Sequence, residues 1–311
     1  VFAGLVIFLL LYLQNCLIRA LGDSKTPTVL LAVTLAINVV LEPVAILVFG
    51  WGIPGAALAT VFSQGIGAFL FWIYIRRRVP VLHTRWSDWQ PNTSVLMAHL
   101  RMGLPMAFQS SVIAIGAIIV QVALNNLGAL PVAAYAATQK IDAVAVMPML
   151  SFGYAMAAYT AQNYGAQKYE RIRMGVHACL KMSMAFAVGI GVLLIAFGTF
   201  FLELFVGADA AGAEEVIAYG HTYLVVTGST YTILALLLVY RNVLQGLGQS
   251  VIPTIAGVME LIMRAVAAIF LCSSLGFLGA CMAYPLAWIG AAIPVVLAYF
   301  WTEKTLRRAA Q

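Results

Sequence analysis

Charged residues are scarce in this chain of 311 residues. Lysine, arginine, aspartate and glutamate together make up 9% of it, whereas soluble domains contain about 25%. So small a share cannot cover the surface of a protein of this size with solvated groups. Hydrophobic residues make up 63%. The composition therefore excludes a soluble domain and predicts a protein whose surface faces lipid.

Cysteine and histidine are also sparse, with four of each. The cysteines lie within or at the ends of apolar segments, without CxxC or Cys/His spacing, so we expect neither a disulfide framework nor a zinc site. No nucleophile–base pair or phosphate-binding loop is recognisable, and the sequence therefore predicts no enzyme and no organic cofactor. The net charge of +6 does not indicate nucleic-acid binding, because the basic residues sit mostly at the ends of apolar segments.

Long apolar segments are what the chain does contain. A helix needs about 20 apolar residues to cross the hydrocarbon of a bilayer, and segment after segment reaches that length. The sequence therefore predicts an all-α polytopic membrane protein. Its nine expected spans are residues 1–19, 28–49, 53–76, 101–125, 130–158, 173–203, 216–243, 252–273 and 278–301.

Basic residues gather in alternate connections between these spans, which predicts the orientation of the chain. The intervening connections near 50–52, 125–131, 204–215 and 274–277 contain none. Because cytoplasmic loops are enriched in lysine and arginine, we expect the basic connections and the C-terminus to be cytoplasmic, in a plasma membrane such as the bacterial inner membrane. The basic connections contain Arg19, Lys25, Arg76, Arg77, Arg78, Lys168, Arg171, Arg173, Arg241 and Lys304.

Two turns of the chain resemble each other. Residues 21–28 read LGDSKTPT and residues 247–254 read LGQSVIPT, 226 positions further on. The pair Gly279-Ala280 repeats Gly55-Ala56 at nearly the same spacing. Both turns are expected on the cytoplasmic side and are followed by two spans, so the two halves share one topology. A parallel repeat of this kind is typical of transporters.

The repeat predicts two six-helix bundles, of which the first is incomplete. The second half begins near residue 100, so about 126 residues, or three spans, are expected ahead of residue 1. Residues 1–78 are then the second half of the N-terminal bundle, residues 79–100 are a cytoplasmic linker, and residues 101–311 form the C-terminal bundle.

Several motifs are similar to those of one transporter family. Residues 19–27, RALGDSKTP, resemble the RxLGDxKTP connection of the multidrug and toxic compound extrusion (MATE) family. NVVLEP at 38–43, GAALAT at 55–60, GLP at 103–105 and QNYGA at 162–166 are also similar to motifs of that family. The resemblance covers the whole chain and corresponds to the family's spans four to twelve. It implies a secondary active antiporter that exports amphipathic, often cationic, organic molecules in exchange for protons or sodium ions by alternating access.

Three polar residues in the first half form a candidate site for the coupling cation. A charge at the bilayer centre costs about 2.5–3.5 kcal/mol, so residues such as Glu42 are expected to have a role. Asn38 and Glu42 lie one helical turn apart on the same face, and Thr60 on the next span adds a hydroxyl. Such oxygen donors suit a small cation, and a carboxylate in an apolar pocket can take up a proton.

The family resemblance implies the same three positions. The family holds the cation of its first bundle with an asparagine and an acidic residue on span five, a threonine on span six and an aspartate on span one. Asn38, Glu42 and Thr60 match the first three, and the aspartate would precede residue 1. We therefore expect proton or sodium coupling at Asn38 and Glu42. The alternative is that both side chains only form hydrogen bonds with neighbouring helices.

Four charged residues lie within spans of the second half. Glu260 and Arg264 are one turn apart, either as an ion pair that neutralises the helix for insertion or as a gating or proton-coupling pair. Lys140 and Asp142 point about 200° apart on a helix and therefore do not pair with each other. Each could contact substrate, take part in coupling or have a purely structural role.

The first and fourth spans of the second half contain Gln109 and Tyr231 at mid-membrane. Some members of the family place carboxylates on these two spans. Because this chain has none there, a sodium site in the second bundle is not expected, although both residues are candidates for lining the cavity.

The alternative function is that of a lipid-linked oligosaccharide flippase of the same broad superfamily. Such a protein moves a large anionic amphiphile and would line its cavity with several basic residues, whereas this chain offers only Lys140 and Arg264. With either function we expect a monomer in the lipid bilayer that handles small amphipathic organic molecules, binds no nucleic acid and needs no cofactor except the coupling ion.

Overall fold

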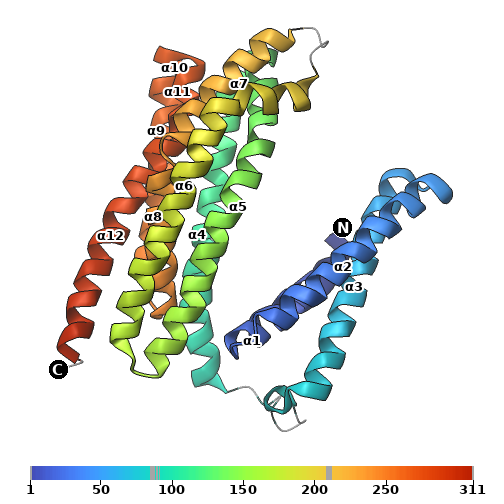
Figure 1. Ribbon diagram of the computed structural model, residues 1–311, viewed down its shortest axis with the longest axis vertical. Coiled ribbons are helices and arrows are strands. Elements are labelled where there is room, and N and C mark those ends of the chain that lie inside the picture. The colour runs from blue at the N-terminus through green and yellow to red at the C-terminus, as the bar shows by residue number, and fades with distance from the viewer. Residues whose placement is uncertain (1, 85–87, 89, 91, 208–211, 310–311) are drawn as a thin grey trace. The chain divides into compact units, whose positions relative to one another are not determined.

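The computed structural model of the protein describes residues 2–84, 88, 90, 92–207 and 212–309. In this part of the chain the regular elements are helices, without a strand, which confirms the predicted all-α class (Figure 1). The chain divides into two compact units, residues 1–92 and residues 93–311. The boundary lies within the segment 79–100 that the sequence indicates as a linker. The two units are described separately below.

The first unit contains three long helices, which pack through small residues. Small buried residues recur every four positions along α3, at Gly55, Ala59, Ser63 and Gly67. A β-carbon at Gly67 would collide with the side chain of Thr34 on α2, so the absence of a side chain lets the two backbones approach closely. The elements of this unit are η1 (Phe2–Gly4), α1 (Leu5–Ala20), α2 (Lys25–Pro43), the π-helical η2 (Val44–Val48), α3 (Gly52–Arg78) and η3 (Pro80–Leu82).

A polar contact fastens the connection between α1 and α2 to the end of α3. Asp23 accepts a hydrogen bond from the backbone N–H of Thr26 at 3.0 Å and another from the hydroxyl of Tyr74 at 2.9 Å. Hydrogen bonds from Thr26, and to a smaller extent from Tyr74, lower the pKa of Asp23 below its ordinary value. The turn that resembles the family motif is therefore held in place by the carboxylate of that motif.

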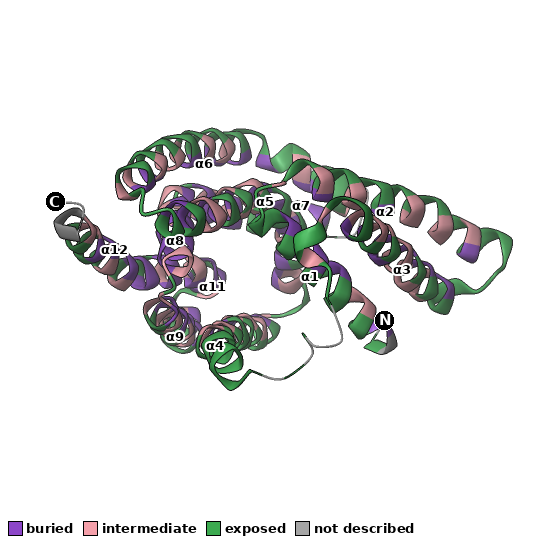
Figure 2. Ribbon diagram, turned by 90° about the horizontal axis from the view of Figure 1, so that it is seen from below, coloured by how far each residue is buried: buried purple, intermediate pink, exposed green. Residues whose placement is uncertain are grey.

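The second unit is a larger bundle built around α8, most of whose side chains are buried. Helices α5, α6 and α12 pack against α8, and α4 pairs with α9. Figure 2 shows exposed residues along the outer sides of these helices and buried ones toward the interior. The elements are α4 (Thr93–Asn125), α5 (Ala129–Gly165), α6 (Tyr169–Val206), α7 (Ala213–Gly228), α8 (Tyr231–Gly246), α9 (Val251–Val266), the π-helical η5 (Ala267–Leu271), α10 (Cys272–Leu275), α11 (Phe277–Cys281) and α12 (Ala283–Ala309).

Each of the nine predicted spans coincides with a helix or with consecutive helices. Among the described residues, seven helices of 24 to 38 residues are long and apolar enough to cross a membrane. An eighth span is the pair α7 and α8, and α1 is a shorter apolar helix of 16 residues. Because α6 leaves Val192, Phe197 and Phe200 more than half exposed, its outer face suits lipid rather than water. The chain is a multi-pass membrane protein.

The predicted span at 216–243 is present as two helices, which are bent by 50° relative to each other between α7 and α8. Ser229 and Thr230 lie at the break and donate their hydroxyls to the carbonyl of Val226 at 2.9 and 3.2 Å. Hydroxyls that donate to helix carbonyls in this way compete with the backbone N–H groups for the same acceptors. Gly228 adds a residue of low helix propensity just before the break.

The internal repeat is visible in the local structure of both units. Helices α2 and α9 begin 226 residues apart, and each continues directly into a π-helical stretch, η2 or η5. In each half a glycine then lies against a carbonyl of that stretch. A β-carbon at Gly55 would lie 3.1 Å from the carbonyl oxygen of Ala45, and one at Gly279 would collide with the carbonyl of Leu271. The glycines of the repeated Gly-Ala pair, Gly55 and Gly279, therefore have the same packing role.

Candidate functional site

The predicted cation site lies on α2 and α3 of the first unit. Asn38 and Glu42 are both half-buried. The amide nitrogen of Asn38 is buried without a hydrogen-bond partner, and within the described residues Glu42 forms no ion pair. Thr60 donates its hydroxyl to the carbonyl of Ala56 at 2.9 Å, which leaves the lone pairs of its oxygen available to a ligand.

The register of the two helices brings these residues to one level. Gly67 faces Thr34, and Gly55 faces Ala45, so α2 and α3 run antiparallel. The same register sets Thr60 opposite residues 40–41 of α2, between Asn38 and Glu42. Two helices of the first unit thus present an amide, a carboxylate and a hydroxyl at one depth. This is the donor set that the sequence predicts for a proton or a small cation.

The second unit contains a cluster of three buried charges, Arg241, Glu260 and Arg264, which we call the charged cluster. The carboxylate of Glu260 accepts one hydrogen bond from each arginine: Oε1 from Nη2 of Arg241, and Oε2 from Nη2 of Arg264 at 3.1 Å. The predicted pair of Glu260 and Arg264 is therefore present, but it is shared with a third residue. Expecting Arg241 in a cytoplasmic connection was wrong, because its side chain is buried on α8.

Arg264 links α9 to two further helices. Its Nη1 donates to the carbonyl of Ile113 on α4 at 2.9 Å, and its guanidinium lies 4.8 Å from the ring centre of Tyr284 on α12. Gly116 makes room for it, since a β-carbon there would lie 3.0 Å from Cδ of Arg264. Both carboxylate oxygens of Glu260 thus accept hydrogen bonds from guanidinium groups.

Gln109 lies in the seam between α4 and α9. It is buried above Gly257, and its Oε1 accepts a hydrogen bond from Gln245 at 3.3 Å. The seam begins where Pro105 interrupts α4. Because proline lacks an N–H, the carbonyl of Arg101 loses its usual donor within the helix, and the hydroxyl of Ser250, the residue before α9, donates to it at 3.2 Å. Gln109 is therefore part of a continuous polar seam.

Asp142 and Tyr231 are in direct contact. The hydroxyl of Tyr231 donates to Oδ1 of Asp142 at 2.6 Å and joins α8 to α5. Lys140, two residues earlier on α5, is exposed, in keeping with the predicted divergence of the two side chains. Glu260, which was a possible partner for Lys140, is instead bound by Arg241 and Arg264. Sequence reasoning did not link Asp142 to Tyr231, because the two are 89 residues apart.

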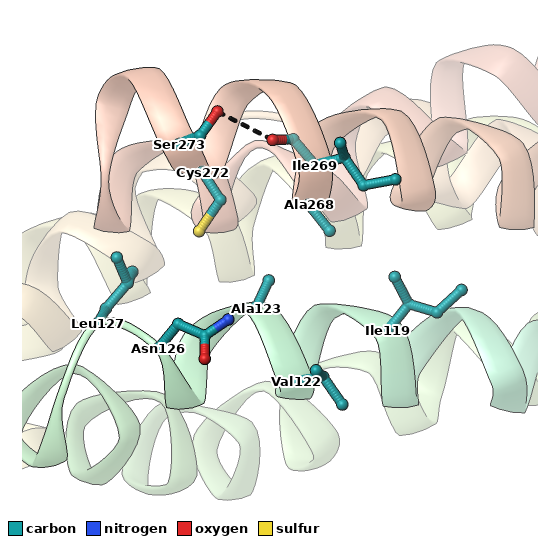
Figure 3. A pocket seen from close by; sticks show the side chains of 9 residues that line it. All are labelled: Ile119, Val122, Ala123, Asn126, Leu127, Ala268, Ile269, Cys272 and Ser273. Carbon is teal, nitrogen blue, oxygen red and sulfur yellow. Dashed lines mark hydrogen bonds between the residues drawn. The ribbon is translucent and has the colours of Figure 1, made fainter.

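An apolar pocket of about 390 Å³ lies between the C-terminal part of α4 and the segment η5–α10 (Figure 3). Its polar lining residues are Asn126 and Ser273, and the hydroxyl of Ser273 turns back to the carbonyl of Ile269 at 2.9 Å. The pocket begins at Ile119, beyond the level of Arg264 and Gly116. It therefore offers apolar surface but no charge to a ligand.

Comparisons with known proteins agree on one family. The sequence profile of the MatE family matches residues 105–270. A probable multidrug resistance protein of Bacillus subtilis, YoeA, is 27% identical over 98% of this chain and 67% of its own length. Another from the same organism, YpnP, is 29% identical over 68% of this chain and 46% of its own length. The chain thus spans about half to two thirds of the length of these curated relatives.

Solved structures share the fold. A crystal structure of the Vibrio cholerae MATE transporter VcmN matches 95% of this chain and 66% of its own chain, with a TM-score of 0.85 and 23% identity. An outward-facing multidrug resistance transporter of the MATE family matches 98% of this chain and 68% of its own, with a TM-score of 0.88 and 20% identity.

Proposed function

Because the chain belongs to the MatE family, we propose that it functions as a secondary active antiporter that exports amphipathic, often cationic, organic compounds. Protons or sodium ions would enter in exchange, by alternating access. The names of the Bacillus subtilis relatives, both probable multidrug resistance proteins, support efflux of this kind. The protein would work as a monomer in a bacterial inner membrane with its C-terminus in the cytoplasm.

The observation that carries the proposal is the set of donors on α2 and α3. Glu42 has no counter-charge among the described residues, although it lies within a span, and the amide of Asn38 is buried without a partner. An uncompensated carboxylate is costly in a membrane, and a proton or a cation bound beside it removes that cost. We assign ion coupling to Glu42, with Asn38 and Thr60 as supporting ligands.

The test is efflux by the full-length protein in vesicles under separately imposed proton and sodium gradients. We expect at least one gradient to drive export of a cationic dye such as rhodamine 123. Glu42→Gln removes the ionisable group but keeps the shape, so it should reduce gradient-driven flux at least tenfold. Glu215→Gln, an exposed substitution in the first turn of α7, is the matched control and should leave the flux unchanged.

Two results would contradict the proposal. Gradient-driven flux that persists in a folded Glu42→Gln protein would exclude this residue as the coupling group. Absence of gradient-driven flux for any amphiphilic cation, with transport of a lipid-linked oligosaccharide instead, would favour the flippase.

A further inference from the structure

Two carboxylates lie inside the second unit, and their surroundings differ sharply. Glu260 is held between two guanidinium groups. Asp142 receives a hydrogen bond from a phenol, and among the described residues it has no ion-pair partner. A carboxylate within a membrane-spanning bundle is costly when it is ionised and lacks a counter-charge. Asp142, rather than Glu260, is therefore the carboxylate of this unit that gains from binding a proton.

The groups around Asp142 on its own helix and on α8 supply hydrogen bonds but no neutralising charge. Tyr231, the donor, is completely buried. Tyr135 lies two turns earlier on α5, within electrostatic reach of Asp142. Lys140 is on the same helix but is exposed and faces elsewhere. Arg241 lies ten residues beyond Tyr231 on α8, about 15 Å away along the helix axis, and is bound to Glu260.

The helices packed against α5 also bring no cation to Asp142. From α7, Tyr223 lies within electrostatic reach of Asp142 and accepts a hydrogen bond from Gln139 at 2.8 Å. His221 on the same helix is hydrogen bonded to the carbonyl of Ile195 on α6 at 3.1 Å. From α12, the hydroxyl of Tyr284 lies 2.9 Å from that of Tyr135. Phenols of α5, α7, α8 and α12 thus surround this part of the bundle.

Helix α6 contributes no ionisable group at this depth. Tyr159 of α5 lies against Gly175, and the ring of Phe152 contacts that of Phe186 edge to face. This antiparallel register places Asp142 opposite residues 187–197 of α6, which read AVGIGVLLIAF. The surroundings of Asp142 toward α6, α7, α8 and α12 are therefore apolar or phenolic.

We infer that Asp142 and Tyr231 form a second proton-binding site, in the C-terminal bundle and separate from Asn38 and Glu42. The proton adds to the carboxylate and forms a neutral carboxylic acid, and no other bond is made or broken. The hydrogen bond from Tyr231 then changes from a charge-assisted to a neutral one, which is about half as strong. The site rests on the proposed function only for the step that couples its proton to efflux.

The position of Tyr231 gives proton uptake a structural consequence. Tyr231 is the first residue of α8, directly after the break at which α7 and α8 are bent by 50°. The bond to Asp142 fastens that end of α8 to α5. When the carboxylate is protonated and this bond weakens, the bent span is held less firmly, whereas deprotonation restores the charge-assisted bond.

Infrared difference spectroscopy of the full-length protein in lipid nanodiscs, between pH 4.5 and 9.5, tests the site directly. A protonated carboxyl group has a C=O stretching band that disappears on ionisation. We expect one such titrating band to be absent from Asp142→Asn and present in Glu42→Gln. Tyr231→Phe removes the donor that favours the ionised form, so the same band should titrate about one pH unit or more higher, a tenfold rise in proton affinity.

The outcomes separate this inference from the proposed function. The second proton site would be overturned if every titrating carboxyl band of the wild type were also present in Asp142→Asn. It would also be overturned if the band titrated at the same pH in Tyr231→Phe as in the wild type. Neither result would affect Glu42-dependent efflux. Gradient-driven efflux that persists in Glu42→Gln, together with a titrating Asp142 band, would instead overturn the assignment of coupling to Glu42 and leave the proton site in place. Circular dichroism and size-exclusion profiles identical to wild type establish that each variant is folded.

Discussion

Glu260 is the residue on which the charge balance of the second unit depends. It is the sole carboxylate that binds Arg241 and Arg264 among the described residues. Glu260→Gln would leave two buried guanidinium groups without a counter-charge, and removal of one partner from a buried ion pair costs about 3–5 kcal/mol. We expect a loss of stability of that size in unfolding of the full-length protein by denaturing detergent.

A matched control is available on the surface of the same unit. Glu170 and Arg173 form an exposed ion pair at 3.2 Å, and exposed pairs contribute about 0–1 kcal/mol. Glu170→Gln should therefore unfold within about 1 kcal/mol of wild type. Equal stability of the two glutamine variants would show that the charged cluster is not a buried ionic core.

How far a residue can be understood from the sequence depends on where its partner lies. Glu260 and Arg264 are predictable as a pair because they lie one turn apart on one helix. Arg241 was misplaced because it lies only five residues before the end of α8, where a basic residue usually marks the cytoplasmic boundary. The bond between Asp142 and Tyr231 depends on the packing of two helices that are distant in sequence, which periodicity does not report.

At the scale of elements, the seam between α2 and α3 positions the proposed cation site. Gly67→Ala would place a methyl group against the side chain of Thr34, and overpacking of this kind costs about 1–3 kcal/mol. The variant should unfold more easily in detergent and should show reduced ion-coupled efflux, because Asn38 and Glu42 lie further along the displaced helix.

The second substitution Thr34→Ala identifies the cause. It removes the atoms that collide, so Gly67→Ala/Thr34→Ala should recover more than half of the lost stability. Gly189 on α6 provides the control, since a β-carbon there meets nothing within 4 Å, and Gly189→Ala should not destabilise the protein. Additive losses in the double variant would show that contact with Thr34 is not the reason that α3 has glycine at this position.

Elements were more predictable than contacts. Eight of the nine predicted spans coincide with helices, or with a bent pair of helices, long and apolar enough to cross lipid, and the first coincides with the shorter apolar helix α1, since length and hydrophobicity decide whether a helix can cross lipid. The repeat of the LGxS turn predicts the equivalence of α2 and α9 because the same sequence forms the same cap and the same π-helical continuation. The break between α7 and α8 escaped prediction, because hydroxyls such as those of Ser229 and Thr230 are also common inside continuous membrane helices.

At the scale of the whole molecule, the second unit has two chemically different ends. Figure 1 shows the turn between α5 and α6 at the same end of this unit as the C-terminus, and α10 and α11 at the opposite end, together with the start of α7. The α5–α6 turn carries Lys168, Arg171 and Arg173, whereas α7 begins with Glu214 and Glu215. By the positive-inside rule, we expect the end with the C-terminus to face the cytoplasm.

Labelling with a membrane-impermeant thiol reagent tests this orientation in the full-length protein. Lys168→Cys, in the turn between α5 and α6, should react in inside-out vesicles and be protected in right-side-out vesicles. Glu215→Cys should show the reverse pattern, and each variant is the control for the other. Cys272 and Cys281 are buried, whereas Cys16 is exposed and Cys179 is partly exposed, so labelling of each variant is compared with labelling of the wild type. The opposite labelling pattern would show that the chain has the inverted orientation. The basic turn between α5 and α6 would then face the exterior, contrary to the positive-inside rule.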